Sequence, residues 1–297
     1  MKVLLIIKPY FFVSILLSFL LFTDCVYSQN APVVKKVTFE DTAREYLLYI
    51  PKKLSKKKPV PLLICLHGYG DSAYMFMYNT RFNDIAEREN FIVVYPQGTL
   101  FKDSPFWNTL GYGRSKINDL GFLENLVYEI SKDYNIDQTR IYAAGMSNGG
   151  FMAMEIACSL SHIFTAVASV TGTMTNKLYE SCNPSENVSV LQIHGTLDRQ
   201  ILYNGNKEWS ISVPTLLEFW SKTNKLNERP KIKTYRGESP YNISKYSYLG
   251  DRKNKTEVVH FKIEKGEHQW YNFNSSDSNT TSELVWDFLS KKSKKSN

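Results

Sequence analysis

The chain has 297 residues, of which 43% are hydrophobic and 14% aromatic, and its formal net charge is +7. This much apolar sequence can bury a full hydrophobic core, and α/β sheets of this size often form one domain. The charge comes largely from Lys52–Lys58 and Lys291–Lys295, without an arginine-rich or aromatic-interleaved stripe, which argues against a nucleic-acid-binding protein.

The first 28 residues predict a secretory signal peptide. Lys2 and Lys8 precede an apolar stretch over 10–22, and residues 26–28 have the pattern expected for cleavage before Gln29. The apolar stretch is shorter than the ~20 residues that span a bilayer, which disfavours an uncleaved anchor. We therefore expect secretion, to the extracellular space or the periplasm, with no membrane attachment after cleavage.

The middle of the chain alternates apolar strand patterns with helical patterns. Residues 62–66 and 91–95 are continuous apolar runs, typical of strands in a sheet that is covered on both faces. Apolar residues at helical spacing over 119–130 predict one of the intervening helices. The remaining elements are expected over 37–39, 46–50, 72–89, 164–170, 188–193, 214–225, 258–263 and 282–290. The alternation indicates an α/β fold with a mostly parallel central sheet, helices on both faces, a single domain over 29–290 and a basic tail over 291–297.

Directly after the apolar run 141–144 comes the sequence Gly145-Met146-Ser147-Asn148-Gly149. A strand that ends in G-x-S-x-G and is followed by a helix is typical of a nucleophile elbow, in which the serine stands on a strained turn. Side chains two residues before and after this serine would collide, so both positions require glycine. The pattern predicts that Ser147 is the nucleophile of a serine hydrolase, above a helix amino end that favours negative charge.

In this arrangement the acid follows the serine and the histidine follows the acid, each on a loop after a strand. The strand over 188–193 leads to Asp198, and the strand over 258–263 leads to His268. An imidazole can take and return the serine proton, while the carboxylate holds the imidazole in one tautomer. We therefore predict that Ser147, Asp198 and His268 form a catalytic triad.

The other histidines are less suitable as the base. His67, His162 and His194 come too early in the required order. His260 lies inside a strand, where its side chain faces the sheet and not a cleft at the strand's end.

Backbone N–H groups are expected to stabilise the oxyanion of the reaction. Asn148, the residue after the nucleophile, supplies one donor, and the loop after the strand 62–66 supplies the second. The Tyr69 N–H is our preferred second donor, and the Gly70 N–H is the alternative. A plain glycine-rich turn between a strand and a helix would have the same sequence.

Two tryptophans are candidate substrate contacts. Trp107 and Trp270 can stack on an aromatic acyl group or a sugar, and Trp270 follows His268 by two residues, although tryptophans also fill cores. The irregular segment 231–257 is rich in tyrosine and lies between the predicted acid and histidine. It is expected to form either a lid over the active-site edge or a surface hairpin.

The cysteines that follow the predicted signal peptide are Cys65, Cys158 and Cys182. Cys65 lies within an apolar strand and is predicted to be buried. Cys158 and Cys182 could pair in an oxidising compartment, but an odd number of cysteines does not indicate a disulfide framework.

No Cys/His cluster has metal-ligand spacing and no glycine loop is suited to phosphate, so we expect neither a metal nor a cofactor.

The combined motifs resemble the secreted polyhydroxybutyrate depolymerase and feruloyl esterase group of α/β-hydrolases, which is similar to carbohydrate esterase family one. The resemblance runs from about Val37 to the last helix and rests on Leu66–Gly70, Tyr95–Gly98, Asp137–Gly150, His194–Asp198 and Gly266–Trp270. It implies an α/β-hydrolase fold and ester hydrolysis through an acyl-serine, with Ser147, Asp198 and His268 at the matching positions. Members often have cysteine or phenylalanine in place of Tyr69 and a Trp-Pro pair in place of Trp270-Tyr271, which leaves the substrate open.

The resemblance implies a secreted serine esterase whose partner is an ester substrate, with feruloyl or acetyl groups on plant polysaccharide ahead of polyhydroxyalkanoate. A peptidase of the prolyl-oligopeptidase type is an alternative, but such enzymes usually carry an extra amino-terminal propeller for which this chain is too short. A binding module with a vestigial triad is a third reading. The presence of all the triad residue types argues against it.

Overall fold

The computed structural model describes residues 31–54, 57–111, 116–235, 241–251, 255–273 and 280–294. The predicted signal peptide lies outside these residues. Ala31–Asn297 forms one compact unit, and the description below concerns this unit alone. Within the described residues, none of the helices has both the length and the apolar character needed to span a bilayer.

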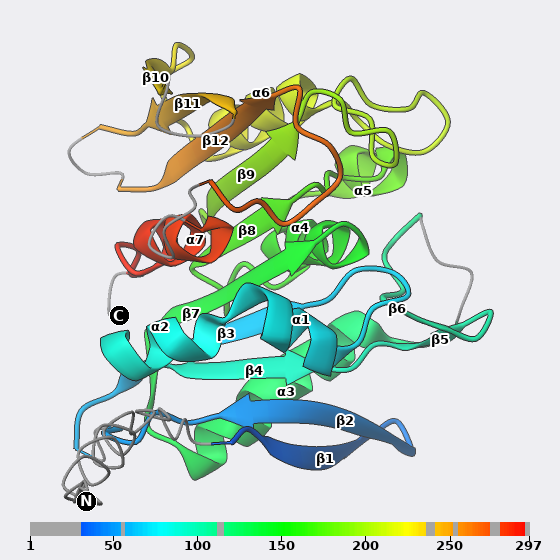
Figure 1. The fold of residues 1–297 in the computed structure, drawn as a ribbon, viewed down its shortest axis with the longest axis vertical. Helices are drawn as coiled ribbons and strands as arrows, with labels where there is room; N and C mark the ends of the chain where they lie inside the picture. Colours follow the sequence, from blue (N-terminus) through cyan, green and yellow to red (C-terminus); the bar gives the residue numbers. More distant parts are fainter. Residues whose placement is uncertain are drawn as a thin grey trace, which may run out of the picture. The chain divides into compact units, whose positions relative to one another are not determined.

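Among the described residues, ten strands form one sheet in the order β1-β2-β4-β3-β7-β8-β9-β12-β11-β10 (Figure 1). The strands are β1 (Val33–Phe39), β2 (Thr42–Tyr49), β3 (Val60–Leu66), β4 (Ile92–Pro96), β7 (Ile136–Met146), β8 (Ala166–Val170), β9 (Ser189–Gly195), β10 (Lys231–Tyr235), β11 (Asn242–Leu249) and β12 (Glu257–Glu264). The central strands from β4 to β12 are parallel. Antiparallel pairs extend the sheet at both ends, so the sheet is mostly but not wholly parallel.

Helices cover both faces of this sheet. They are α1 (Ala73–Thr80), α2 (Phe82–Glu89), α3 (Asp119–Asp133), α4 (Asn148–Ser159), α5 (Asn176–Ser181), α6 (Val213–Thr223) and α7 (Thr281–Leu289). Alternate side chains of β3 point to opposite faces: Leu62 and Ile64 pack with α3, α4 and α6, whereas Leu63 and Cys65 pack with α1, α2 and α7. Figure 1 shows the second group of helices in front of the sheet.

The predicted helix over 72–89 is two helices. Arg81 ends α1 in the left-handed region, at φ 54°, and its N–H donates to the carbonyl of Met77. Because α2 begins at the next residue, the chain bends here and packs Phe76 and Phe82 against the same face of the sheet. Arginine gives no sequence signal for a left-handed residue.

Within its described residues, the segment 231–257 contains a hairpin that extends the sheet. The strand β10 pairs with β11, and β11 pairs with β12, all antiparallel. Tyr246 stacks on His260 with ring centroids 5.9 Å apart, and Tyr248 packs against the core. These tyrosines therefore complete the edge of the fold.

The described part of the basic tail is paired with acidic residues. Lys292 is buried and its Nζ lies 2.7 Å from a carboxylate oxygen of Glu257, while Lys294 Nζ lies 2.8 Å from Glu186. As far as Lys294, the tail is therefore attached to the domain by ion pairs and is not a freely solvated run of lysines.

A disulfide joins the end of α4 to the end of α5. Cys158 and Cys182 are bonded across a sequence separation of 24, and Cys65 is free and buried in β3. A cross-link over a loop of this length restricts the unfolded chain and typically stabilises a protein by about 3 kcal/mol.

Replacing both Cys158 and Cys182 by alanine is therefore expected to lower the free energy of unfolding by about 3 kcal/mol. The measurement is urea unfolding with and without a reductant. The reductant should destabilise the natural protein and leave the double variant unchanged; equal midpoints for both proteins without reductant would show that the bond contributes nothing.

Candidate active site

Ser147 stands on a strained turn between β7 and α4. Its backbone has φ 52° and ψ −119°, a conformation that residues with a side chain rarely adopt. A Cβ at Gly145 would lie less than 3.0 Å from the Gly149 carbonyl oxygen, and a Cβ at Gly149 equally close to the Leu66 carbonyl oxygen. Both glycines are therefore required by packing, as the elbow pattern predicts.

Asp198 and His268 form a hydrogen-bonded pair. His268 Nδ1 lies 2.8 Å from Asp198 Oδ2, and the Asp198 side chain is completely buried. Burial alone would raise the pKa of Asp198, but hydrogen bonds from His194, His268 and the Ile201 N–H outweigh it, so this pKa lies well below its ordinary value. Asp198 is therefore a carboxylate at neutral pH and favours the His268 tautomer whose proton is on Nδ1.

The sheet brings these side chains to one edge. The ends of four neighbouring strands are aligned. Met146 at the end of β7 is paired with Val170 in β8. Val170 is paired with Ile193 in β9, and Ile193 with Phe261 in β12. Because these strands are parallel, the loops that carry Ser147, Asp198 and His268 all leave from their carboxyl ends (Figure 1). No hydrogen bond joins Ser147 Oγ to His268 in the described residues; such bonds often tighten only when substrate is bound.

The loop after β3 passes directly beside Ser147. A Cβ added to Gly68 would lie 3.7 Å from the Ser147 Cβ. The Gly70 N–H donates to the Pro105 carbonyl over 2.9 Å, which occupies the alternative oxyanion donor. Of the two oxyanion donors predicted in this loop, the Tyr69 N–H therefore remains, and it is the one we prefer.

His67 fixes the peptide that carries the Tyr69 N–H. The Gly98 N–H donates to His67 Nε2 over 2.9 Å, so Nδ1 holds the proton and donates to the Gly68 carbonyl over 2.8 Å. In a trans peptide the Gly68 carbonyl and the Tyr69 N–H point in opposite directions, so the Tyr69 N–H points away from His67. Burial lowers the pKa of His67 to about 4, which keeps this imidazole neutral.

Asn148 contributes a side chain as well as a backbone donor. Its N–H is the first of α4 and has no partner within the helix. Its buried side chain accepts from the Trp107 N–H over 2.7 Å and donates to the Trp107 carbonyl over 3.0 Å. Asn148 therefore holds the loop around Trp107 next to the elbow, a role that the sequence did not indicate.

The prediction that Trp107 contacts substrate is wrong, because its side chain has no exposed surface. Its indole N–H donates to the His67 carbonyl over 3.0 Å and its ring packs on His67, so it fills the space behind the loop. Trp270 is half-buried: it packs edge-on against Phe76 and Phe82 and donates to Ser282 Oγ over 3.0 Å. It attaches the His268 loop to α1, α2 and α7, and a role in the pocket stays a prediction.

Glu155, a buried acidic residue of the helix that follows Ser147, was missed by sequence reasoning. Glu155 on α4 accepts a hydrogen bond from the Leu110 N–H over 2.7 Å. Burial raises the pKa of Glu155 to about 7. A second buried carboxylate, Asp119, accepts from the Asn108 N–H over 2.8 Å and pairs with Arg44 over 2.6 Å. The loop 107–110 is therefore fixed at several points.

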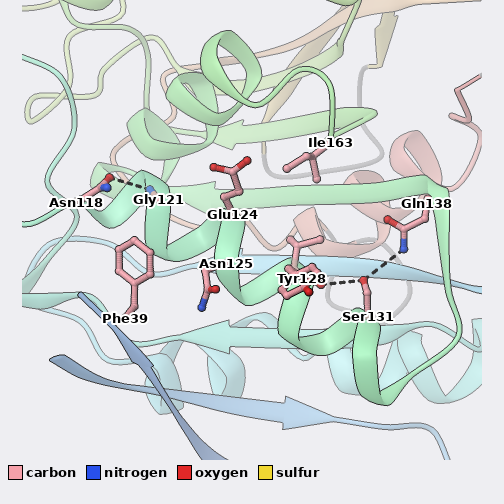
Figure 2. Close-up of a pocket in the computed structure, with 10 residues that line it drawn as sticks. Phe39, Asn118, Gly121, Glu124, Asn125, Tyr128, Ser131, Gln138 and Ile163 are labelled. Atoms are coloured by element: carbon pink, nitrogen blue, oxygen red, sulfur yellow. Dashed lines mark hydrogen bonds between the residues drawn. The ribbon is translucent and has the colours of Figure 1, made fainter. Parts of the chain in front are cut away.

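A groove of about 600 Å³ lies along α3 (Figure 2). Its lining includes Phe39, Asn125 and Tyr128, and contains none of the predicted triad or oxyanion residues. The groove is therefore not part of the candidate active site. Within the described residues, no group of three or more His, Cys, Asp or Glu side chains is arranged to hold a metal ion.

Residues 44–189 match the family model described as Esterase PHB depolymerase. Feruloyl esterase B of Piromyces equi is 26% identical over 201 residues, which cover 64% of this chain and 37% of that protein. The bifunctional acetylxylan esterase/xylanase XynS20E of Neocallimastix patriciarum is 26% identical over 164 residues, 55% of this chain and 23% of that protein. The chain thus spans less than half the length of these relatives.

Among solved structures, an acetyl xylan esterase from Aspergillus awamori superposes with a TM-score of 0.61 at 13% identity, covering 87% of this chain and 99% of that one. At this level of identity the likeness concerns the fold alone. It shows that the described domain has an α/β-hydrolase type of fold, with a large mixed sheet between helices.

Replacing Glu155 by glutamine is expected to change how stability depends on pH. Since the folded pKa of Glu155 is about 7 against an ordinary value of 4.5, the folded state binds the extra proton, and the natural protein loses stability as pH rises from about 4.5 to 7. This loss amounts to roughly 3 kcal/mol, and glutamine, which keeps an acceptor for the Leu110 N–H, removes it.

The measurement is the difference in free energy of unfolding between the two proteins at a series of pH values. The variant should gain on the natural protein steadily between about pH 5 and 7. A difference that stays constant over this range, whatever its size, would contradict the expected raised pKa of Glu155.

Proposed function

Since the chain carries an Esterase PHB depolymerase domain and has feruloyl esterases among its homologues, we propose that it is a secreted serine esterase. It hydrolyses carboxylic esters through an acyl-serine intermediate. Secretion is supported by the predicted signal peptide and by the disulfide between Cys158 and Cys182, since such bonds persist in oxidising compartments.

The proposed reaction uses the geometry at the carboxyl edge of the sheet. His268 removes the Ser147 proton as the hydroxyl oxygen attacks the ester carbonyl, and Asp198 stabilises the imidazolium that forms. The N–H groups of Asn148 and Tyr69 stabilise the tetrahedral oxyanion. His268 then protonates the leaving alcohol, and a water molecule, activated by the same imidazole, releases the acid from Ser147.

The proposal rests above all on the geometry of Ser147 and of the Asp198–His268 pair. Ser147 has a strained backbone at a turn that requires glycine on both sides, at the same sheet edge as a buried carboxylate paired with an imidazole at 2.8 Å. Backbone strain of this kind costs on the order of 1–3 kcal/mol and persists where the position of a side chain matters for function. A binding module would gain nothing from it.

For the substrate, we propose feruloyl or acetyl esters on plant polysaccharide. The printed names of the two relatives, a feruloyl esterase and an acetylxylan esterase/xylanase, support this class. The description of the family model supports polyhydroxybutyrate as the alternative substrate. Both are carboxylic esters, so the same residues would act on either.

The test is to supply the purified protein with p-nitrophenyl acetate, methyl ferulate and a hydroxybutyrate oligomer. We expect hydrolysis of the first two and a loss of kcat of at least about 10⁴-fold in the Ser147→Ala variant, because the nucleophile is removed. Cleavage of the oligomer in preference to methyl ferulate would favour the depolymerase.

The matched control is Ser169→Ala, which removes another buried serine hydroxyl close to the elbow, at the end of β8. Its kcat should stay near that of the natural protein. The proposed function is wrong if no ester is cleaved, or if Ser147→Ala cleaves as fast as the natural protein.

A further inference from the structure

A second imidazole contacts the carboxylate of Asp198. His194, near the end of β9, is completely buried, and its Nε2 lies 3.2 Å from Asp198 Oδ2 and 2.8 Å from the Ile201 carbonyl oxygen. The place of His194 before the acid in the chain argues against a role as the catalytic base. Its position in the fold gives it a different role.

The tautomer of His194 follows from its neighbours. Gln192 Nε2 lies 2.8 Å from the Gly172 carbonyl oxygen and 3.0 Å from His194 Nδ1. Because a carbonyl oxygen only accepts, the amide nitrogen of Gln192 faces it, and His194 Nδ1 accepts from the same amide. The proton of His194 is therefore on Nε2, which donates toward Asp198 and Ile201.

With His194 Nε2 beside Oδ2, polar groups surround both carboxylate oxygens of Asp198. Oδ1 accepts from the N–H groups of Gln200 and Ile201, each over 2.9 Å. Oδ2 accepts from His268 Nδ1 at 2.8 Å, and His194 Nε2 lies 3.2 Å from the same oxygen. The atom that orients the predicted catalytic base thus has a completely buried imidazole on its second side.

We propose that His194 is a positioning residue of this esterase, which acts through Asp198. It holds Oδ2 in line with His268 Nδ1 and stabilises the carboxylate while His268 becomes positively charged. The proposal rests on the proposed function, since it assumes that Asp198 and His268 serve Ser147. It assigns to His194 no contact with the substrate.

If His194 only stabilised the fold, it would act through its hydrogen bond to the Ile201 carbonyl oxygen and not through Asp198. The His194 Nε2 proton also reaches the Ile201 carbonyl, and this bond alone would fix the loop 198–201. The two roles predict different behaviour when Asp198 is absent. A bond to Ile201 still matters in that background, whereas a role that acts through the carboxylate does not.

The experiment is a double-mutant cycle of His194→Met and Asp198→Ala, measured as kcat and KM on p-nitrophenyl acetate. Methionine fills similar space without a donor. In the natural background His194→Met should lower kcat about 10- to 100-fold, the effect of one hydrogen bond to a charged group, with KM within about twofold. In the Asp198→Ala background it should change kcat by no more than about twofold.

The matched rescue variant is His194→Gln, which has the length of methionine and carries an amide donor near the place of Nε2. It should recover most of the lost kcat. Tyr203→Phe controls for disturbance of the same buried cluster: the Tyr203 ring packs on His194, but its hydroxyl bonds to His260 and does not contact Asp198. Its kcat should stay within about twofold of the natural protein.

The proposal is overturned if His194→Met leaves kcat unchanged, if its effect on kcat is as large in the Asp198→Ala background, or if glutamine restores nothing. Failure of the proposed function is distinct. It would appear as ester cleavage that is insensitive to Ser147→Ala, whatever the result at His194.

Discussion

The close packing of the elbow against its neighbours is the constraint on which the site depends. A Cβ at Gly145 or Gly149 would collide with backbone carbonyl oxygens, and a Cβ at Gly172 would collide with the backbone of Gly150 and with the Ser147 carbonyl. The glycines let the end of β7, the start of α4 and the segment after β8 approach within backbone contact. Since the Leu66 and His67 carbonyl oxygens also lie close to Gly149, Ser147 and the loop after β3 belong to one tightly packed unit.

Around the elbow the protein buries polar groups, and most of them form hydrogen bonds. An unsatisfied buried donor or acceptor costs about 1–3 kcal/mol, so each such group restricts where its partners can lie. His67 orients the Gly68–Tyr69 peptide, Asn148 holds Trp107, and Glu155 holds Leu110. These contacts fix the loops at the carboxyl edge of the sheet, and donors fixed in this way are what electrostatic preorganisation uses.

The sequence predicted those features that depend on a local pattern with a steric or chemical reason. The elbow glycines and the strands that lead to Asp198 and His268 could be predicted because each follows from a few neighbouring residues. Features set by distant contacts could not. Trp107 is buried although tryptophan often lines pockets, and the left-handed residue Arg81 divides a helix without a sequence signal. The order of residues along the chain does not reveal that His194 lies beside Asp198 in the fold.

In the proposed function, one serine hydroxyl at the sheet edge is activated by the imidazole paired with Asp198. This activation is tested most directly by treating the protein with a fluorophosphonate, which forms a bond to an activated serine oxygen as fluoride leaves, and by locating the adduct by mass spectrometry. We expect a single adduct on Ser147, and its formation should slow by orders of magnitude when His268 is replaced by alanine. An adduct on another residue, or labelling of Ser147 that is equally fast without His268, would contradict the proposed function.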